Sequence, residues 1–389
     1  MMIARSFILS LNAGVFVFTA FSTYLLTALF IKISHRFDLL DYPIGRKTHK
    51  HPIPFLGGVG IFLSFWFVVF LGLLFAYFFN EKIISDRPLK TFFSWALYLT
   101  PKIVWIFFGS LILLCVGLFD DKFHWSPAKK LAGQCLATLI LMRLGLSINL
   151  LSSLGSFGYL ATFIWILLII NAFNFIDSLD GHCAGIAFIS SIVFFSITQI
   201  IHQPLVGLFL IAFAGALAGF FPHNFKPAKI FLGDNGSLFI GYLMAAFTLL
   251  CRYQTSQTNY VAAFIPVLVF GVPIYDTVSV VSARLLRGIP PWEGDRNHFA
   301  HRLVKLGMSE RVAVAFSYFI ALTLGLIAIL TTQVTFLGAL LIGLVFFSII
   351  GVIAFLEFYA AQRIRIADEL AKKYRRRRED VRDVEEERS

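Results

Sequence analysis

The chain has 389 residues and a formal net charge of +11, and it is 58% hydrophobic but only 14% charged. Soluble globular proteins carry about 25% charged residues, so this composition and a mean hydropathy of +0.81 exclude a soluble fold. Long apolar runs without strand-like alternation favour helices over a β-barrel and predict an all-α polytopic membrane protein. The four scattered cysteines predict neither a disulfide framework nor a zinc site.

Eleven apolar segments are long enough to cross a bilayer. The first has no A-x-A-like end, so we expect it to stay as a membrane span rather than to be a cleaved signal. An odd number of spans places the two termini on opposite sides of the membrane. The predicted spans cover residues 7–33, 55–79, 99–119, 128–146, 158–176, 183–201, 204–221, 236–251, 260–283, 311–331 and 334–360.

Positive charge is distributed unequally between the two sides that these spans define. Of the 33 Lys and Arg residues, 26 fall on the side of the C-terminus and seven on the other. The positive-inside rule therefore places the C-terminus in the cytoplasm and the N-terminus outside. We expect a transmembrane domain over 1–362 and a charged cytoplasmic tail over 363–389. Because bilayer topology accounts for the net charge, no nucleic-acid partner is expected.

The stretch from Asn171 to Gly181, N-A-F-N-F-I-D-S-L-D-G, is the one around which the other motifs are organised. Asp177 and Asp180 lie three residues apart, so a helix would place them on one face with Asn174. A carboxylate at the end of an apolar helix costs several kcal/mol unless it has a partner. A helix cap is the alternative explanation, because Asp and Ser start helices and Asp-Gly is common in turns.

Further acids lie at the same predicted membrane face. Asp120 and Asp121 end the third span together, and adjacent carboxylates favour a bound cation or a retained proton. Lys129 and Lys130 follow at the start of the next span, so charge-balanced helix caps are the structural alternative. Asp234 lies in a Gly-flanked turn before a helix. It either caps that helix or supplies an oxygen ligand to a metal ion. Oxygen ligands from separate loops are what a hard Mg²⁺ ion requires.

Two basic loops alternate with these acids. The first contains Lys47 and His49 in R-K-T-H-K-H-P-I-P-F-L-G-G. Its basic residues either bind phosphate groups or are there only because they hold the loop in the cytoplasm under the positive-inside rule. The second follows Asp276, an acid that needs a partner inside the ninth span. Its composition favours a phosphate-binding lid, because His-x-x-His without Cys or Glu partners is a weak zinc signal. The candidate residues of this lid are Arg284, Arg287, Arg296, His298, His301 and Arg302.

Five such loops on one face describe a site that holds a metal ion and a diphosphate. The membrane setting predicts that one of the substrates is a lipid. A secondary transporter is the main alternative, because intramembrane acids can carry ions. It is disfavoured because no internal repeat is evident and the acids lie at one face rather than at the midplane. A structural membrane scaffold leaves the ordered motifs without an explanation.

The motifs resemble those of the polyprenyl-phosphate N-acetylhexosamine-1-phosphate transferases, the family that includes the MraY-type and WecA/TagO-type enzymes. The resemblance runs from about residue 40 to 305 and rests on R-K-T-H-K-H-P-I-P-F-L-G-G, G-L-F-D-D-K-F-H-W-S-P-A-K-K-L-A-G-Q, N-A-F-N-F-I-D-S-L-D-G, F-L-G-D-N-G-S-L-F-I-G, V-P-I-Y-D-T and D-R-N-H-F-A-H-R-L. It implies transfer of a sugar-1-phosphate, with GlcNAc-1-phosphate expected, from a UDP-N-acetylhexosamine to undecaprenyl phosphate with release of UMP. This is the first membrane step of cell-surface glycan synthesis.

The resemblance also implies the setting of the reaction. It places the catalytic domain, residues 1–362, among the lipids of the bacterial inner membrane with its active site on the cytoplasmic face. It implies Mg²⁺ as the cofactor, with Mn²⁺ as a substitute, and it is compatible with a homodimer. The expected catalytic residues are Asp120, Asp121, Lys130, His298 and His301.

Position within the family motifs implies the separate roles. Asp120 is the first member of the acidic pair, where a base or a substrate-positioning group is found. Asp234 matches the Mg²⁺ ligand of the G-D-x-G motif, with Asp120, Asp121 and Asp177 as further candidate ligands. Lys130 matches an active-site lysine, and the two histidines match the loop at the sugar diphosphate. The expected substrate-binding residues are Lys47, His49, Asn174, Asp177, Asp180, Arg296 and Arg302.

Two positions depart from the family pattern. The loop D-R-N-H-F-A-H-R-L is closer to the WecA/TagO form, D-R-x-H-x-H-H-R-L, than to the H-x-H-H-H of MraY, but Ala300 replaces one histidine. Ser178 stands where Gly is usual between the two aspartates. The first departure bears on the sugar assignment, so an MraY-type transfer of phospho-MurNAc-pentapeptide is the alternative reaction.

Overall fold

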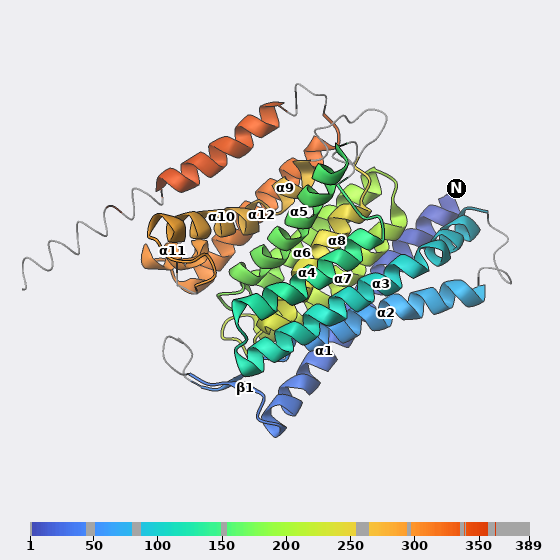
Figure 1. The fold of residues 1–389 in the computed structure, drawn as a ribbon. Coiled ribbons are helices and arrows are strands. Elements are labelled where there is room, and N and C mark those ends of the chain that lie inside the picture. Colours follow the sequence, from blue (N-terminus) through green and yellow to red (C-terminus); the bar gives the residue numbers. More distant parts are fainter. Residues whose placement is uncertain are drawn as a thin grey trace, which may run out of the picture.

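The computed structural model describes residues 2–43, 51–79, 87–148, 154–253, 264–293, 297–334, 338, 340–356 and 362. These residues form a bundle of helices with one short hairpin at one end (Figure 1). The elements are α1 (Met2–Arg36), β1 (Leu40–Asp41), β2 (Ile53–Pro54), α2 (Gly57–Phe79), α3 (Arg87–Phe123), α4 (Pro127–Arg143), α5 (Ser156–Ile176), α6 (His182–Ile200), α7 (Pro204–Asn224), α8 (Gly233–Leu250), α9 (Ile265–Val269), α10 (Gly271–Leu286), α11 (Phe299–Lys305) and α12 (Glu310–Thr331).

The chain is a multi-pass helical membrane protein. Seven helices in the described part are long and apolar enough to cross a bilayer, and several of them expose large apolar side chains, as Phe67, Trp105 and Phe319 illustrate. These spans are Phe7–Arg36, Gly57–Phe78, Lys90–Phe123, Ser156–Ile176, His182–Ile200, Pro204–Asn224 and Glu310–Thr331. The total of eleven spans and the orientation of the chain stay predictions.

Several predicted spans differ from the observed helices in length or continuity. The predicted span 99–119 lies inside the much longer α3, and the span 128–146 corresponds to α4, a helix of 17 residues. The span 260–283 is divided into α9 and α10, which meet at Phe270. Pro266 opens α9 and Pro273 lies in the first turn of α10, where a missing N–H breaks no hydrogen bond. Hydropathy does not detect such a break, because both halves are apolar.

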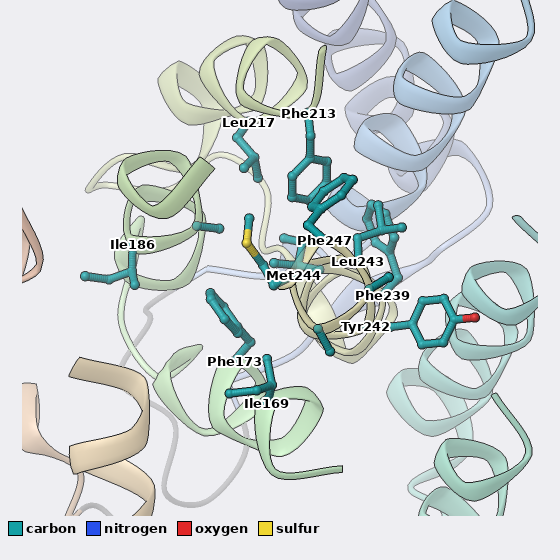
Figure 2. Packing of buried hydrophobic residues seen from close by; sticks show 14 of the residues in the cluster. Ile169, Phe173, Ile186, Phe213, Leu217, Phe239, Tyr242, Leu243, Met244 and Phe247 are labelled. Carbon is teal, nitrogen blue, oxygen red and sulfur yellow. The ribbon is translucent and has the colours of Figure 1, made fainter. Parts of the chain in front are cut away.

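Helix α8 is the centre of the bundle, and its side chains from Asn235 to Leu249 are all buried. A helix that is apolar on every side must be surrounded by other elements. Figure 2 shows Phe239, Met244 and Phe247 of α8 packed against side chains of the neighbouring helices α5, α6 and α7. Because α8 begins with the sequence G-D-N-G, this central helix fixes the place of Asp234 at one end of the core.

Backbone contacts attach the first turn of α8 to the start of α2. Phe231 N–H donates to the Pro54 carbonyl at 2.8 Å, Gly57 N–H to the Phe231 carbonyl at 3.1 Å and Gly58 N–H to the Leu232 carbonyl at 3.1 Å. A side chain at Gly58 would collide with the backbone of Gly236. The absence of Cβ therefore permits this close approach of the two helices. The same end holds the β1–β2 hairpin, in which Leu40 pairs with Pro54.

We predict that Gly58→Ala destabilises the protein by about 1–3 kcal/mol, because the new methyl group must push apart two packed backbones. Gly72→Ala in the same helix is the matched control, since a Cβ at Gly72 has no atom within 4 Å. Ala is also favoured over Gly in helices by about 1 kcal/mol. Thermal unfolding in detergent should show a lower midpoint for Gly58→Ala and an unchanged or higher one for Gly72→Ala. Equal midpoints for the two variants would contradict the close approach.

Candidate active site

Four helices bring polar side chains together at the end of the bundle where α8 begins. Lys130 of α4 forms ion pairs with Asp234 of α8 and, at 3.2 Å, with Asp120 at the end of α3. The amide nitrogen of Asn174 in α5 donates to Asp234 at 2.7 Å and to Ser237 at 2.9 Å. The contacts at this end join residues up to 114 positions apart in sequence, as the hydrogen bonds between Asp121 and Asn235 show. The structure thus assembles the predicted acidic, basic and amide groups in one place.

Asp121 has a different environment from its neighbour in the acidic pair. Its two carboxylate oxygens accept hydrogen bonds from the backbone N–H groups of Asp234 at 2.9 Å and Asn235 at 3.1 Å, and from the Asn235 side chain at 2.7 Å. Helix N-termini carry unpaired N–H groups and a partial positive charge, both of which favour an anion. Asp121 therefore caps α8 from the neighbouring helix α3, and it locks the position of Asp234.

The Asn171–Gly181 stretch ends α5 and supplies two further acids. Asp177 is the residue directly after the helix, and desolvation raises the pKa of its carboxyl well above the ordinary value, with the nearby carboxylates of Asp234 and Asp121 raising it further. Asp180 accepts the backbone N–H of Ala228 at 3.0 Å, which attaches this turn to the α7–α8 loop.

This turn is held from two more sides. Asn224 at the end of α7 accepts the Gly181 N–H at 3.0 Å and donates to the Ile230 carbonyl at 2.9 Å. The hydroxyl of Tyr318 in α12 donates to the Gly181 carbonyl at 2.6 Å. Gly181 itself adopts φ +77°, a backbone conformation that glycine reaches without strain. The turn that presents Asp177 is therefore fixed by α7 and α12.

At the end of the bundle where α8 begins, there are more carboxylates than ammonium groups to pair with them. Lys130 pairs with Asp120 and Asp234, and Asp177 is close enough to interact electrostatically with Lys130 and Asp234. All the donor atoms of these acids are oxygens, the ligand type that Mg²⁺ prefers. Within the described ranges, no three acidic, histidine or cysteine side chains already converge as a metal-binding group. In the arrangement seen here, Lys130 supplies the positive charge that faces these carboxylates.

The second basic loop returns to the same region through α10 and α11. His298 Nδ1 lies 2.8 Å from a carboxylate oxygen of Asp276, and the other oxygen of Asp276 accepts the Phe299 N–H. The His298 ring packs edge-on against Phe175 of α5, with 5.7 Å between the ring centroids. Since Phe175 directly follows Asn174, the histidine loop lies beside the last turn of α5.

The other residues of this loop have distinct positions. The His301 ring centroid is 6.5 Å from that of His298. Arg302 donates to Ser279 of α10 at 2.8 Å and to the Asn297 carbonyl at 3.0 Å, so it ties the loop to α10. Ala300 is fully buried, so its side chain contributes to the packing of the loop.

Three predicted substrate-binding residues, Lys47, His49 and Arg296, lie outside the described residues. The C-terminal end of the first basic loop is nevertheless placed, because the Pro54 carbonyl of β2 accepts a hydrogen bond from Phe231 N–H, just before α8. Sequence reasoning did not single out Ser237 or Asn235. Asn235 follows Asp234 in G-D-N-G, a polar pair at the start of an apolar helix that would have indicated a shared role.

Comparisons with known proteins agree with the motif pattern. Residues 103–252 match the family model of glycosyl transferase family 4. The chain is 31% identical to the Bacillus subtilis (strain 168) protein "Probable undecaprenyl-phosphate N-acetylglucosaminyl 1-phosphate transferase", over 81% of this chain and 85% of that protein. It is 31% identical to a Mycolicibacterium smegmatis decaprenyl-phosphate N-acetylglucosaminephosphotransferase, over 79% and 78% of the two chains. It is 26% identical to the Escherichia coli (strain K12) undecaprenyl-phosphate alpha-N-acetylglucosaminyl 1-phosphate transferase, over 75% and 77%. The chain therefore belongs to glycosyl transferase family 4.

Proposed function

We propose that this protein transfers N-acetylglucosamine-1-phosphate from UDP-GlcNAc to undecaprenyl phosphate and releases UMP. The observation that carries the proposal is the group formed by Asp120, Lys130, Asn174 and Asp234, which four helices assemble at one end of a membrane bundle. The names of the relatives, which combine a polyprenyl phosphate with N-acetylglucosaminyl 1-phosphate, support the same reaction. In this reaction the lipid phosphate oxygen becomes bonded to the β-phosphorus of the donor, and the bond from that phosphorus to UMP breaks.

The reaction needs positioning and charge neutralisation more than covalent chemistry. Charge spreads over the equatorial oxygens of the transferred phosphoryl group, so fixed cations and hydrogen-bond donors lower the barrier. Lys130 is placed for this purpose, because its ammonium is already held among carboxylates and needs little reorganisation. The lipid phosphate is already anionic at neutral pH, so Asp120 is assigned to positioning through Lys130 rather than to deprotonation.

We assign Mg²⁺ to the carboxylates of Asp234 and Asp177, with Mn²⁺ as a substitute. When bound, the ion would neutralise the donor diphosphate and polarise its phosphoryl oxygens. Asp177 fits this assignment because its desolvated carboxylate lies near other acids, and a cation would offset that repulsion. Asp120 is the further candidate ligand. Asp121 is assigned a structural part, since both of its oxygens already hold the first turn of α8.

The remaining predicted residues are assigned to the substrates. His298 and His301 lie on the side of α5 where Phe175 projects, and we place the sugar diphosphate between them and Lys130. Lys47, His49, Arg296 and Arg302 are assigned to phosphate groups, and Asp180 to the loop that shapes the nucleotide site. The cytoplasmic orientation of this end, the count of eleven spans, the location in the bacterial inner membrane and a homodimeric state are parts of the same proposal.

An MraY-type donor, UDP-MurNAc-pentapeptide, is the alternative within the same chemistry. The relatives described above all have N-acetylglucosaminyl names, which favours UDP-GlcNAc. An ion-coupled transporter is the alternative of another class. The positions of the acids disfavour a transporter, because the acids lie at the ends of α3 and α5 and at the start of α8, beside Lys130 of α4, rather than at midspan.

The first test is UMP release in detergent with Mg²⁺, undecaprenyl phosphate and a panel of UDP-sugars. We expect turnover with UDP-GlcNAc and none without the lipid phosphate, because the lipid is the acceptor. The Asp234→Asn variant, purified in the same way, controls for a contaminating transferase. Turnover with UDP-MurNAc-pentapeptide alone would replace the donor assignment, and absence of turnover with every donor would refute the proposed reaction.

The second test concerns the metal ion. Chelation should abolish turnover, and addition of Mg²⁺ or Mn²⁺ should restore it. Loss of a ligand or its support commonly weakens metal binding by about 10–100-fold. Asp177→Asn should therefore raise the Mg²⁺ concentration for half-maximal turnover by about 10-fold or more, while Asp180→Asn, which alters a loop contact, should leave it near the parent value. Full activity in excess chelator would refute the assignment.

The third test separates the two members of the acidic pair. Asp120→Asn should lower kcat by about 10²-fold or more, in the range of a single group acting at the transition state, without lowering the unfolding midpoint. Asp121→Asn should lower the unfolding midpoint by a loss of about 1–2 kcal/mol. The two N–H groups of α8 lie at different oxygens of Asp121, and an amide replaces one of these oxygens by N–H₂ and removes the negative charge at the helix end. The reverse pattern, with Asp120 affecting the midpoint alone, would show that the two roles are exchanged.

A further inference from the structure

Asp276 is a buried acid of α10 whose two oxygens both serve the histidine loop. Its side chain is 1% exposed. One oxygen lies 2.8 Å from His298 Nδ1 and the other accepts the Phe299 N–H. A buried carboxylate that lacked such partners would cost several kcal/mol. Asp276 is therefore a partner of one particular imidazole, and this local arrangement accounts for an acid within an apolar segment.

The His298 ring is held on two sides. Asp276 engages Nδ1, and Phe175 of α5 contacts the ring edge-on at an interplanar angle of 71°. A carboxylate only accepts hydrogen bonds, so the proton stays on Nδ1 in both the neutral and the charged imidazole. Protonation of His298 then changes Nε2 alone, which accepts when the ring is neutral and donates when it is charged.

The His298 ring packs against the last turn of α5, and the same turn also contacts the acidic cluster. Phe175, which supports His298, directly follows Asn174, whose amide donates to Asp234 at 2.7 Å. The charged and titratable groups near this pair are the histidines and arginines of α6, α10 and α11. They are His182, which starts α6, Arg284, whose guanidinium lies 5.4 Å from the Phe175 ring, His301 and Arg302. Asp276 is the carboxylate that directly contacts His298.

We propose that Asp276 is a positioning residue that fixes the tautomer and the orientation of His298, so that Nε2 faces the donor diphosphate. The inference rests on the proposed function for the identity of that substrate. No net proton transfer is required, because a charged His298 donates a hydrogen bond to a phosphoryl oxygen and retains its proton. An acid that orients a histidine through Nδ1 acts in this way in other catalytic sites.

A purely structural role for Asp276 makes a different prediction. In that case the carboxylate serves only to tie the loop to α10 through the Phe299 N–H, and the tautomer of His298 is irrelevant to turnover. Asn at this position has the same shape but a single acceptor oxygen. The two partners lie at different carboxylate oxygens, so the one amide oxygen can replace the acceptor for Phe299 N–H or for His298 Nδ1 but not for both in place. With the Phe299 contact kept, the amide N–H₂ faces Nδ1 and forces the proton of the neutral ring onto Nε2.

The experiment uses the full chain in detergent with Asp276→Asn, His298→Gln and the double variant, assayed for UMP release. We expect Asp276→Asn to lower kcat by about 10²-fold or more with KM for UDP-GlcNAc within about threefold, as for a group needed in the transition state. The double variant should lose no more than His298→Gln alone, because the acid acts through the histidine. Asp38→Asn, an exposed acid that pairs with Tyr42, is the matched control and should retain parental kcat.

A spectroscopic measurement makes the test independent of turnover. Two-bond ¹⁵N–¹H spectra of ¹⁵N-histidine-labelled protein, assigned by comparison with His298→Gln, report which ring nitrogen carries the proton. We expect the Nδ1–H tautomer for neutral His298 in the parent. The Nε2–H tautomer there, parental kcat in Asp276→Asn, or multiplicative losses in the double variant would each overturn the proposal. Because the parent needs no substrate for this spectrum, a failure of the donor assignment would not be mistaken for a failure of the pair.

Discussion

The contact between Asp121 and the first turn of α8 is the interaction on which the site depends. It joins the carboxylate of one helix to two backbone N–H groups of another, at 2.9 and 3.1 Å, where the helix end is positive and its N–H groups lack partners. Desolvated charge is stable only when paired, so the acid and the helix end each satisfy the other. Asp234 lies in that turn, and its direction toward Lys130 and Asn174 follows from this contact.

Because α8 is buried at the centre of the bundle, the packing of the neighbouring helices also holds its first turn in place. Its main neighbours are α2, α3 and α5, and Gly58 of α2 and Gly117 of α3 allow those backbones to touch its first turn. Close-packed cores resist small displacements, so the polar end of α8 cannot shift without repacking the centre of the protein. A rigid apolar core is therefore what keeps the carboxylates close despite their repulsion.

The sequence allowed the membrane class, the helical fold and most of the site to be predicted, because hydropathy and the placement of acids are local signals. It did not divide the labour between Asp120 and Asp121, since both read as acids at a helix end. Charge and position alone did not separate Lys130 from Lys129, and only the resemblance to the family motif selected Lys130; the structure places the Lys129 ammonium 5.9 Å from the Trp125 ring. These choices depend on the direction in which each side chain leaves its helix and on what faces it. The break at Phe270 depends likewise on packing that apolar composition does not encode.

The last turn of α5 connects the two halves of the candidate site. Consecutive residues of a helix point about 100° apart, so Asn174 reaches Asp234 while Phe175 supports His298 on the other side. One rigid turn thus sets the separation between the acidic cluster and the histidine loop. A phosphoryl transfer requires the groups on the two sides of the diphosphate to be placed together before reaction, because positioning supplies much of the rate. The turn is itself anchored by Asn224 and Tyr318 through Gly181, which explains why the helices α7 and α12, remote from the acids in sequence, are needed to hold them.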